Sequence, residues 1–358
     1  MKILDKYIIK KFLGTFAFAL ILILAITIVF DVSEKIDNFL EENAPLNAII
    51  FDYYLNFIPY FANLFSSLFV FITVIFFTSK MASNTEIIAI LSNGVSFSRM
   101  MRPYLISAFI IALTSFFLGA YIIPPANETR IDFDNKYLRG YYTNQDRNIH
   151  KQIRPGVYVY MRSFNSDNDM AFKFSMEKFE NDKLKSKLIS NYARYDTSIN
   201  KWSVRNYYIR EINGVEETIK KGYRLDTAIN LSPSDLETRA DVVETMDLTE
   251  LNKFIEKTRM QGSERVVSYI FDMHSRFAYP FSIIVLTIMG VALSARKSRG
   301  GIGLHIGLGI LLSFTYILFM RFSKMFAISG AAPPILAVWI PNILYGIITV
   351  FLYRSAPK

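Results

Sequence analysis

The side chains that most often perform chemistry in enzymes are scarce in this sequence. The 358-residue chain has three histidines, His150, His274 and His305, and no cysteine. The histidines lie far apart and form no metal-binding spacing such as HExxH. Neither a GxSxG nucleophile motif nor a GxxxxGK[ST] phosphate-binding loop is present. We therefore predict no catalytic residue, no metal site and no cofactor, so that energy for any active work has to come from another chain.

The most informative polar segment lies between residues 84 and 94. Asn84 or Thr85 can cap the start of a helix, and the carboxylate of Glu86 favours the positive N-terminal end of one. Asn93-Gly94 supplies the left-handed conformation that ends many helices. These residues predict a helix of barely two turns.

This short helix has an apolar side, on which we expect Ile87, Ile88 and Leu91. A helix of this length is marginal alone, so it needs a partner surface. The partner is either lipid, which would make it an interfacial helix, or another protein. The residues alone leave both interpretations open.

A second group of candidate residues is charged and lies at the ends of long apolar runs. Its members are Asp31, Glu34, Lys35, Asp272, Arg276, Arg321 and Lys324. Asp272 and Arg276 have the spacing that pairs side chains on one helix face. The cations can bind phosphate groups through charge-assisted hydrogen bonds, and the alternative is ordinary snorkelling toward the membrane interface.

The elements that carry these residues are membrane spans. The chain is 52% hydrophobic and only 20% charged. Its uncharged runs are Phe12–Phe30, Tyr53–Ser79, Pro103–Asn127, Phe277–Ala295, Gly300–Met320 and Met325–Tyr353. About 20 apolar residues cross a bilayer as a helix. The runs predict six transmembrane helices and exclude a soluble enzyme.

The distribution of charge predicts the orientation of these spans. With the N-terminus inside, the inner segments carry 12 basic and two acidic residues, whereas the short outer segments carry three basic and six acidic ones. Lys and Arg concentrate in cytoplasmic loops, so both termini should be cytoplasmic. The net charge of +9 is then a topology signal. It gives no support to nucleic-acid binding.

A polar insert, roughly Pro124–Arg276, separates the third span from the fourth. Apolar and polar residues alternate from Phe172 to Glu177, which is typical of a strand. We expect strands over Leu184–Tyr195, Trp202–Ile212 and Tyr223–Ala228, with a break at Asn181-Asp182-Lys183 and a type I′ turn at Asn213-Gly214. Strands spaced in this way favour a sandwich or an open barrel. A helix capped by Thr249 should run to Met260 and end before Gly262.

With these residues in view, the chain resembles the LptF/LptG permease family of the lipopolysaccharide exporter. The resemblance covers the whole chain and depends on short motifs in a fixed order. They are Leu4-Asp5-Lys6-Tyr7-Ile8, Glu86-x-x-Ala89-x-x-x-x-Gly94, Ile123-Pro124-Pro125-Ala126-Asn127, Arg276-x-x-x-Pro280 and Trp339-Ile340-Pro341-Asn342.

The resemblance implies a membrane α plus β fold in the bacterial inner membrane. Residues 1–123 would form spans one to three, residues 124–276 a periplasmic β-jellyroll-like domain with a helical connector, and residues 277–358 spans four to six. The implied partners are an LptB-type ATPase dimer, a second LptF/LptG-type permease and an LptC-type bridge protein. The implied substrate is lipopolysaccharide, taken from the outer leaflet of the inner membrane through lateral gates formed by spans one and five.

The resemblance also implies roles for individual residues. The segment around 84–94 would be the coupling helix seated in the ATPase, with contacts from Glu86, Ile87, Ala89, Ile90, Leu91 and Gly94. Asp31 and Lys35 match a charged cluster that contacts substrate in the family. Together with Arg276, Arg321 and Lys324, they form the predicted substrate-binding set.

Two other functions fit part of the pattern. One is a signal-transmitting membrane protein of the FtsX/MacB kind, in which an ATPase moves a periplasmic domain and no lipid crosses. Those proteins have four spans with the large loop after the first, which differs from this chain. The other is a lipid-modifying membrane enzyme, which needs several ionisable residues inside the spans. Only His305 meets that requirement.

Overall fold

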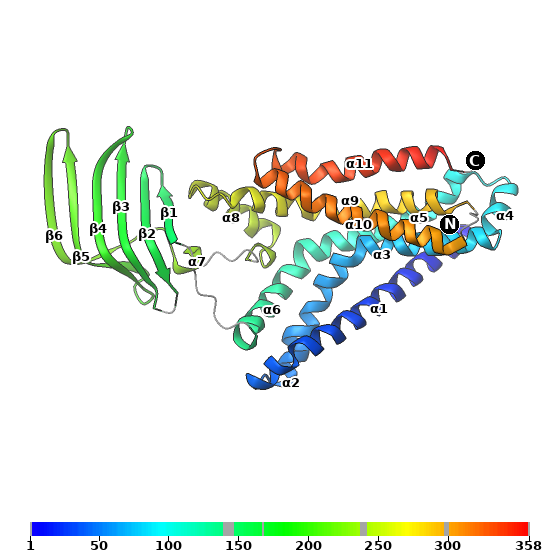
Figure 1. Cartoon of the computed structure of the whole chain (residues 1–358), viewed down its shortest axis with the longest axis horizontal. Coiled ribbons are helices and arrows are strands. Elements are labelled where there is room, and N and C mark those ends of the chain that lie inside the picture. The colour runs from blue at the N-terminus through cyan, green and yellow to red at the C-terminus, as the bar shows by residue number, and fades with distance from the viewer. Residues whose placement is uncertain (1, 139–146, 167, 237–241, 297–300, 357–358) are drawn as a thin grey trace. The chain divides into compact units, whose positions relative to one another are not determined.

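The computed structural model describes residues 2–138, 147–166, 168–236, 242–296 and 301–356 (Figure 1). These residues divide into two compact units. The first unit is helical and comprises residues 1–138, 244–249 and 267–358. The second contains the β-sheet and comprises residues 139–243 and 250–266.

The helical unit contains six helices long and apolar enough to cross a membrane. Its elements are α1 (Ile3–Glu41), α2 (Leu46–Ala48), the π-helix η1 (Ile49–Tyr54), α3 (Leu55–Ser83), α4 (Glu86–Ser92), α5 (Phe97–Phe117), the π-helix η2 (Leu118–Ile122), α6 (Ile123–Tyr137), α9 (Val266–Ser294), α10 (Gly301–Ile328) and α11 (Pro334–Arg354). The six apolar helices and the sheet that follows the third of them confirm the membrane α plus β fold expected from the sequence.

Helix α3 lies at the centre of the bundle, where it packs against α1, α5, α6 and α10. Its buried side chains, among them Val70, Val74 and Phe77, join a core completed by α1, α5 and α9. Figure 1 shows the start of α1, the short α4 and the end of α11 at one end of this bundle. The basic start of α1, with Lys6, Lys10 and Lys11, therefore lies at the same end of the bundle as α4.

The prolines inside the spans leave carbonyl groups that the helix cannot satisfy. Pro341 in α11 has no N–H for the carbonyl of Ala337, one turn earlier. The buried hydroxyl of Ser323 in α10 donates to that carbonyl instead. Beside it, Asn342 accepts from Tyr316 at 2.9 Å and donates to the carbonyl of Ala278 at 2.9 Å. Side chains from α10 and α11 thus supply hydrogen bonds where lipid offers none.

The sheet unit holds one six-stranded antiparallel sheet in which the strands lie in sequence order (Figure 1). The strands are β1 (Arg147–Arg154), β2 (Val157–Asn165), β3 (Met170–Glu180), β4 (Lys183–Asp196), β5 (Lys201–Asn213) and β6 (Glu216–Thr227). The strands predicted over Leu184–Tyr195 and Trp202–Ile212 and the break after Glu180 are confirmed, whereas β6 begins at Glu216, before the predicted Tyr223. Asn181 and Asp182 have φ of 50° and 58°, the positive angles of a type I′ turn.

The hairpin between β5 and β6 differs from its prediction. Asn213 pairs with Glu216, so the two loop residues are Gly214 and Val215 rather than Asn213 and Gly214. Only Gly214 has a positive φ, of 69°. This pattern fits a type II′ turn, which needs glycine at its first central position, and the predicted type I′ turn is wrong.

One face of the sheet carries the core of this unit. Alternate residues of β2 are buried, and Trp202 of β5 is fully buried against Phe174. The indole N–H of Trp202 donates to the carbonyl of Leu231 at 2.7 Å, which holds the segment before α7 (Pro233–Leu236) over this core.

Two short elements complete the described chain, the 3₁₀ turn η3 (Val242–Glu244) and the helix α8 (Leu248–Met260). The helix predicted up to Met260 is present, and Gly262 after it has a φ of 70°. Its cap differs from the prediction, since Asp247 accepts a hydrogen bond from the N–H of Thr249 at 2.7 Å.

Candidate functional site

The short helix α4 forms as the sequence predicts, but its ends are built differently. Thr85 begins the helix in a left-handed conformation with φ of 63°, and its hydroxyl makes no capping bond. The predicted side-chain cap is therefore wrong. Gly94 has a φ of 79° and ends the segment, as expected.

One face of α4 packs against the chain's own bundle. Ile87 is 1% exposed, and Ile90 and Leu91 are half-buried against the same core of α1, α3 and α5. Ile88 is 56% exposed and so does not share the side of Ile87, contrary to the prediction. The face that remains open to a partner is formed by Ile88 and Ala89.

Glu86, at the first turn of α4, is tied to the first span. One of its carboxylate oxygens accepts from the hydroxyl of Tyr7 at 3.1 Å. The other accepts from the amide of Asn84 at 3.3 Å. The position of α4 is thereby coupled to α1.

A second contact joins α1 to the neighbourhood of α4. The guanidinium of Arg99, at the start of α5, binds both carboxylate oxygens of Asp5 at 2.7 and 2.8 Å. Asp5 also accepts from the backbone N–H of Lys2 at 2.9 Å, and its side chain is 8% exposed. A two-pronged guanidinium–carboxylate pair fixes distance and orientation together. It sets α1 against the loop that holds α4.

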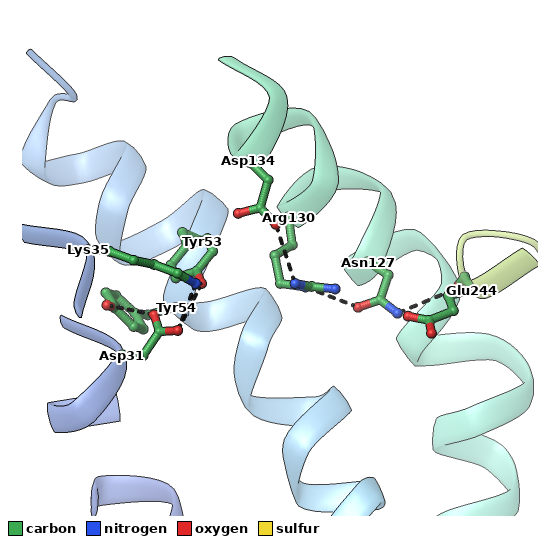
Figure 2. A network of polar contacts seen from close by, with 8 residues as sticks. All are labelled: Asp31, Lys35, Tyr53, Tyr54, Asn127, Arg130, Asp134 and Glu244. Atoms are coloured by element: carbon green, nitrogen blue, oxygen red, sulfur yellow. Dashed lines mark hydrogen bonds and ion pairs between the residues drawn. The ribbon is translucent and has the colours of Figure 1, made fainter. Parts of the chain in front are cut away.

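At the opposite end of α1, Asp31 is the centre of a polar cluster (Figure 2). Lys35 lies one turn later, with its ammonium 2.7 Å from one oxygen of Asp31. The hydroxyl of Tyr54 donates to the other oxygen at 3.1 Å. Tyr53 hydrogen-bonds with Lys35, whose ammonium lies 4.7 Å from the centre of its ring. The charge of Lys35 is thus neutralised and held within the chain.

Both tyrosines that reach Asp31 belong to the π-helix η1. They are adjacent in sequence and lie in its last turn. π-bulges are frequent at functional sites.

A second polar group in Figure 2 belongs to α6 and the η3 segment. Arg130 lies 3.6 Å from Asp134 and donates to Asn127 at 3.3 Å, and its guanidinium lies over the ring of Tyr60. Asn127 donates to the backbone carbonyl of Glu244 at 3.4 Å. This group fastens the segment that precedes α8 to α6.

The remaining predicted substrate residues lie on α9 and α10 and differ in their interactions. Lys324 forms an ion pair with Asp272 at 2.6 Å, which links α10 to α9. Arg276 donates to the carbonyl of Met246 at 2.8 Å. Arg321 is exposed and forms no ion pair with any residue that the structure describes.

The structure therefore brings Asp31 and Lys35 together and places Arg276, Arg321 and Lys324 on neighbouring helices. It adds partners that the sequence reasoning missed, namely Tyr7, Tyr53 and Tyr54, and it pairs Asp272 with Lys324. The signal for Asp272 was its own charge, but its spacing pointed to Arg276 instead of Lys324. For the tyrosines no signal was available, because they lie inside or beside apolar runs and their partners are distant in sequence.

Six membrane-length helices and an inserted sheet unit define a multi-pass membrane protein. The family model described as lipopolysaccharide export system permease LptF/LptG matches residues 6–355. The chain belongs to this family. Among curated proteins, the comparison found no match.

Proposed function

We propose that this chain is a permease subunit of an ABC transporter that extracts lipopolysaccharide from the outer leaflet of the bacterial inner membrane. A separate LptB-type ATPase dimer would drive it, and the chain itself would catalyse no reaction. The observation that carries the proposal is the family match over residues 6–355, which includes all six apolar helices, α4 and the sheet.

The open face of α4 supports docking to the ATPase. Ile88 is 56% exposed on a helix whose opposite face is anchored in the bundle. An anchored helix transmits a push to the spans, because Ile87 and Leu91 connect it to α3 and α5 and Glu86 connects it to α1. In this proposal Ile88 and Ala89 contact the ATPase, while Ile87, Ile90, Leu91 and Gly94 hold the helix in place.

The proposed lipid path is supported by the two spans that are least buried within the chain. Each span has an apolar stretch of 18 residues. Only 6% of that stretch is buried within the chain in α1 and 22% in α10, against 33–61% in the other spans. Large side chains such as Phe18 and Phe314 are exposed on these helices. We assign α1 and α10, the first and fifth spans, to the lateral gates, facing lipid and a second LptF/LptG-type permease.

The orientation in the membrane is part of the same proposal. The basic end of the bundle, with α4 and both ends of the chain, would be cytoplasmic, following the bias of Lys and Arg toward that side. Residues 124–276 would then be periplasmic, between the span-forming segments 1–123 and 277–358. The sheet would pass lipid to an LptC-type bridge protein.

Substitution of Ile88 tests the coupling role. Ile88→Asp should abolish co-purification of the ATPase, because a charge replaces the apolar side chain at the contact. Val215→Asp, at a fully exposed turn of the sheet, is the matched control and should leave the complex intact. A complex that survives Ile88→Asp unchanged would overturn the assignment.

Depletion of the chain tests the transported substrate. Newly made lipopolysaccharide should then accumulate in the inner membrane. Normal delivery to the cell surface would instead favour a signal-transmitting protein of the FtsX/MacB kind.

A further inference from the structure

A cavity at the basic end of the bundle has no role in the function proposed above. It has a volume of about 160 Å³ and lies among residues of α1, α3 and the start of α4. Its polar lining includes Tyr7, Lys11, Lys80, Asn84 and Glu86, and its apolar lining includes Phe76.

The two lysines give the cavity its chemistry. Lys11 and Lys80 are exposed, and neither forms an ion pair within the described part of the chain; the ammonium of Lys11 lies 5.9 Å from the centre of the Tyr7 ring. The one carboxylate in the lining, Glu86, is turned to Tyr7 and Asn84 by hydrogen bonds of 3.1 and 3.3 Å. The lining therefore carries a net charge of +1 and two ammonium groups free to donate to an anion.

The lysines also lie at the level where a bilayer presents its headgroups. Lys11 directly precedes the uncharged run Phe12–Phe30 of α1, and Lys80 directly follows the uncharged run Tyr53–Ser79 of α3. Each is thus the first charge beyond an apolar span. Basic pockets between spans at this level bind anionic lipid headgroups.

The apolar part of the lining distinguishes a lipid from a free anion. Phe76 is 40% exposed in the last turns of α3, on the membrane side of Lys80. A small inorganic ion gains nothing from this surface, whereas the acyl chains below a phosphate headgroup pack against it.

We propose that this cavity binds the phosphate headgroup of an anionic phospholipid from the leaflet at the basic end of the bundle. Lys11 and Lys80 bind the phosphate. Because Glu86 shares the cavity, the bound lipid borders the first turn of α4. The site is separate from the exported lipid, which the proposed function takes from the opposite leaflet.

Titration of the purified full-length chain with lipid tests this site. Phosphatidylglycerol is added in detergent and bound lipid is counted by native mass spectrometry, with phosphatidylcholine as the zwitterionic comparison. Phosphatidylglycerol should bind more tightly. The double variant Lys11→Gln/Lys80→Gln should weaken this binding, by about fivefold for each lysine removed.

The control variant is Lys10→Gln/Arg102→Gln, which removes two exposed cations from α1 and α5 that do not line the cavity. It should bind phosphatidylglycerol like the unmodified chain. Equal weakening in both variants would show a general charge effect and overturn the site. Unchanged binding in Lys11→Gln/Lys80→Gln would also overturn it.

Two further outcomes identify a different occupant. Complete displacement of the lipid by millimolar inorganic phosphate would show an anion site that does not need the acyl chains. Loss of the ATPase, with lipid binding retained, in Lys11→Gln/Lys80→Gln would show that the lysines bind protein. Either outcome overturns the lipid proposal. Neither bears on the export function, which is tested separately through Ile88 and lipopolysaccharide delivery.

Discussion

The hydroxyl of Tyr7 donates a 3.1 Å hydrogen bond to the carboxylate of Glu86, across 79 positions of sequence. This bond joins the first turns of α1 to the first turn of α4. α1 is also the least covered of the six spans. A displacement of α4 is therefore passed directly to the start of α1, which also packs against α3 and α5.

Removal of the Tyr7 hydroxyl should loosen α4 without unfolding the bundle. A hydrogen bond of this kind contributes about 0.5–1.5 kcal/mol, so Tyr7→Phe should speed amide exchange in residues 87–92 by about two- to tenfold. Hydrogen-exchange mass spectrometry of the purified chain measures this rate. Tyr121→Phe, an exposed tyrosine of η2, is the control. An unchanged exchange rate in Tyr7→Phe would show that Ile87 and Leu91 alone hold the helix.

The pair formed by Asp5 and Arg99 should behave as a unit. Arg99→Ala leaves the 8% exposed carboxylate of Asp5 without its two strongest donors, and should lower the melting temperature. In an Asp5→Asn background the same substitution should cost less, because no buried charge remains. Additive effects of the two substitutions in a thermal double-mutant cycle would contradict a direct interaction.

The hydrogen bond from Ser323 to Ala337 should matter only while Pro341 is present. Ser323→Ala leaves the carbonyl of Ala337 without a donor and should cost about 1–2 kcal/mol. Pro341→Ala restores an N–H one turn after Ala337, so Ser323→Ala should cost little in that background. Unfolding in mixed detergent measures both.

Ser313 offers a matched control for this prediction. It is a buried serine of the same helix whose hydroxyl has no hydrogen-bond partner among the described residues. Ser313→Ala should therefore be nearly neutral. An equal loss of stability at both serines would show that packing, rather than the carbonyl freed by Pro341, determines the effect.

The sequence-based predictions succeeded for features set by residues close in sequence and failed for features set by residues far apart in sequence. Spans and strands follow from local patterns, so the apolar runs and the alternation around Phe174 located them correctly. The turn after β5 was misplaced by one residue because Asn213-Gly214 and Gly214-Val215 are both acceptable turns, and strand pairing decides between them. Local pattern was insufficient where tertiary contacts decide, as with Ile88.

The candidate site shows the same limit. Its charged members were visible because charges stand out at the ends of apolar runs. Their pairing was not, because Lys324 and Asp272 are 52 positions apart and Tyr54 and Asp31 are 23 apart. The π-helical turn that contains Tyr53 and Tyr54 has no marker in the sequence.

If the chain binds lipopolysaccharide as proposed, Lys35 and Arg321 should contribute unequally to that binding. Lys35 is held by Asp31 and Tyr53, so a phosphate group can bind it only by displacing a carboxylate. Arg321 is exposed and forms no ion pair in the described chain, so its guanidinium is available. A charge-assisted hydrogen bond contributes about 1.5–3 kcal/mol, so Arg321→Gln should weaken binding about tenfold or more.

Binding of lipopolysaccharide to the purified transporter, followed at increasing salt, measures the difference. Lys35→Gln should have a smaller effect than Arg321→Gln, and the loss in Arg321→Gln should shrink at high salt as the charge is screened. Tyr53→Phe should increase the contribution of Lys35, since it removes one of the groups that restrain the ammonium. A larger loss in Lys35→Gln than in Arg321→Gln would mean that substrate displaces Asp31, and that the cluster in Figure 2 opens during transport.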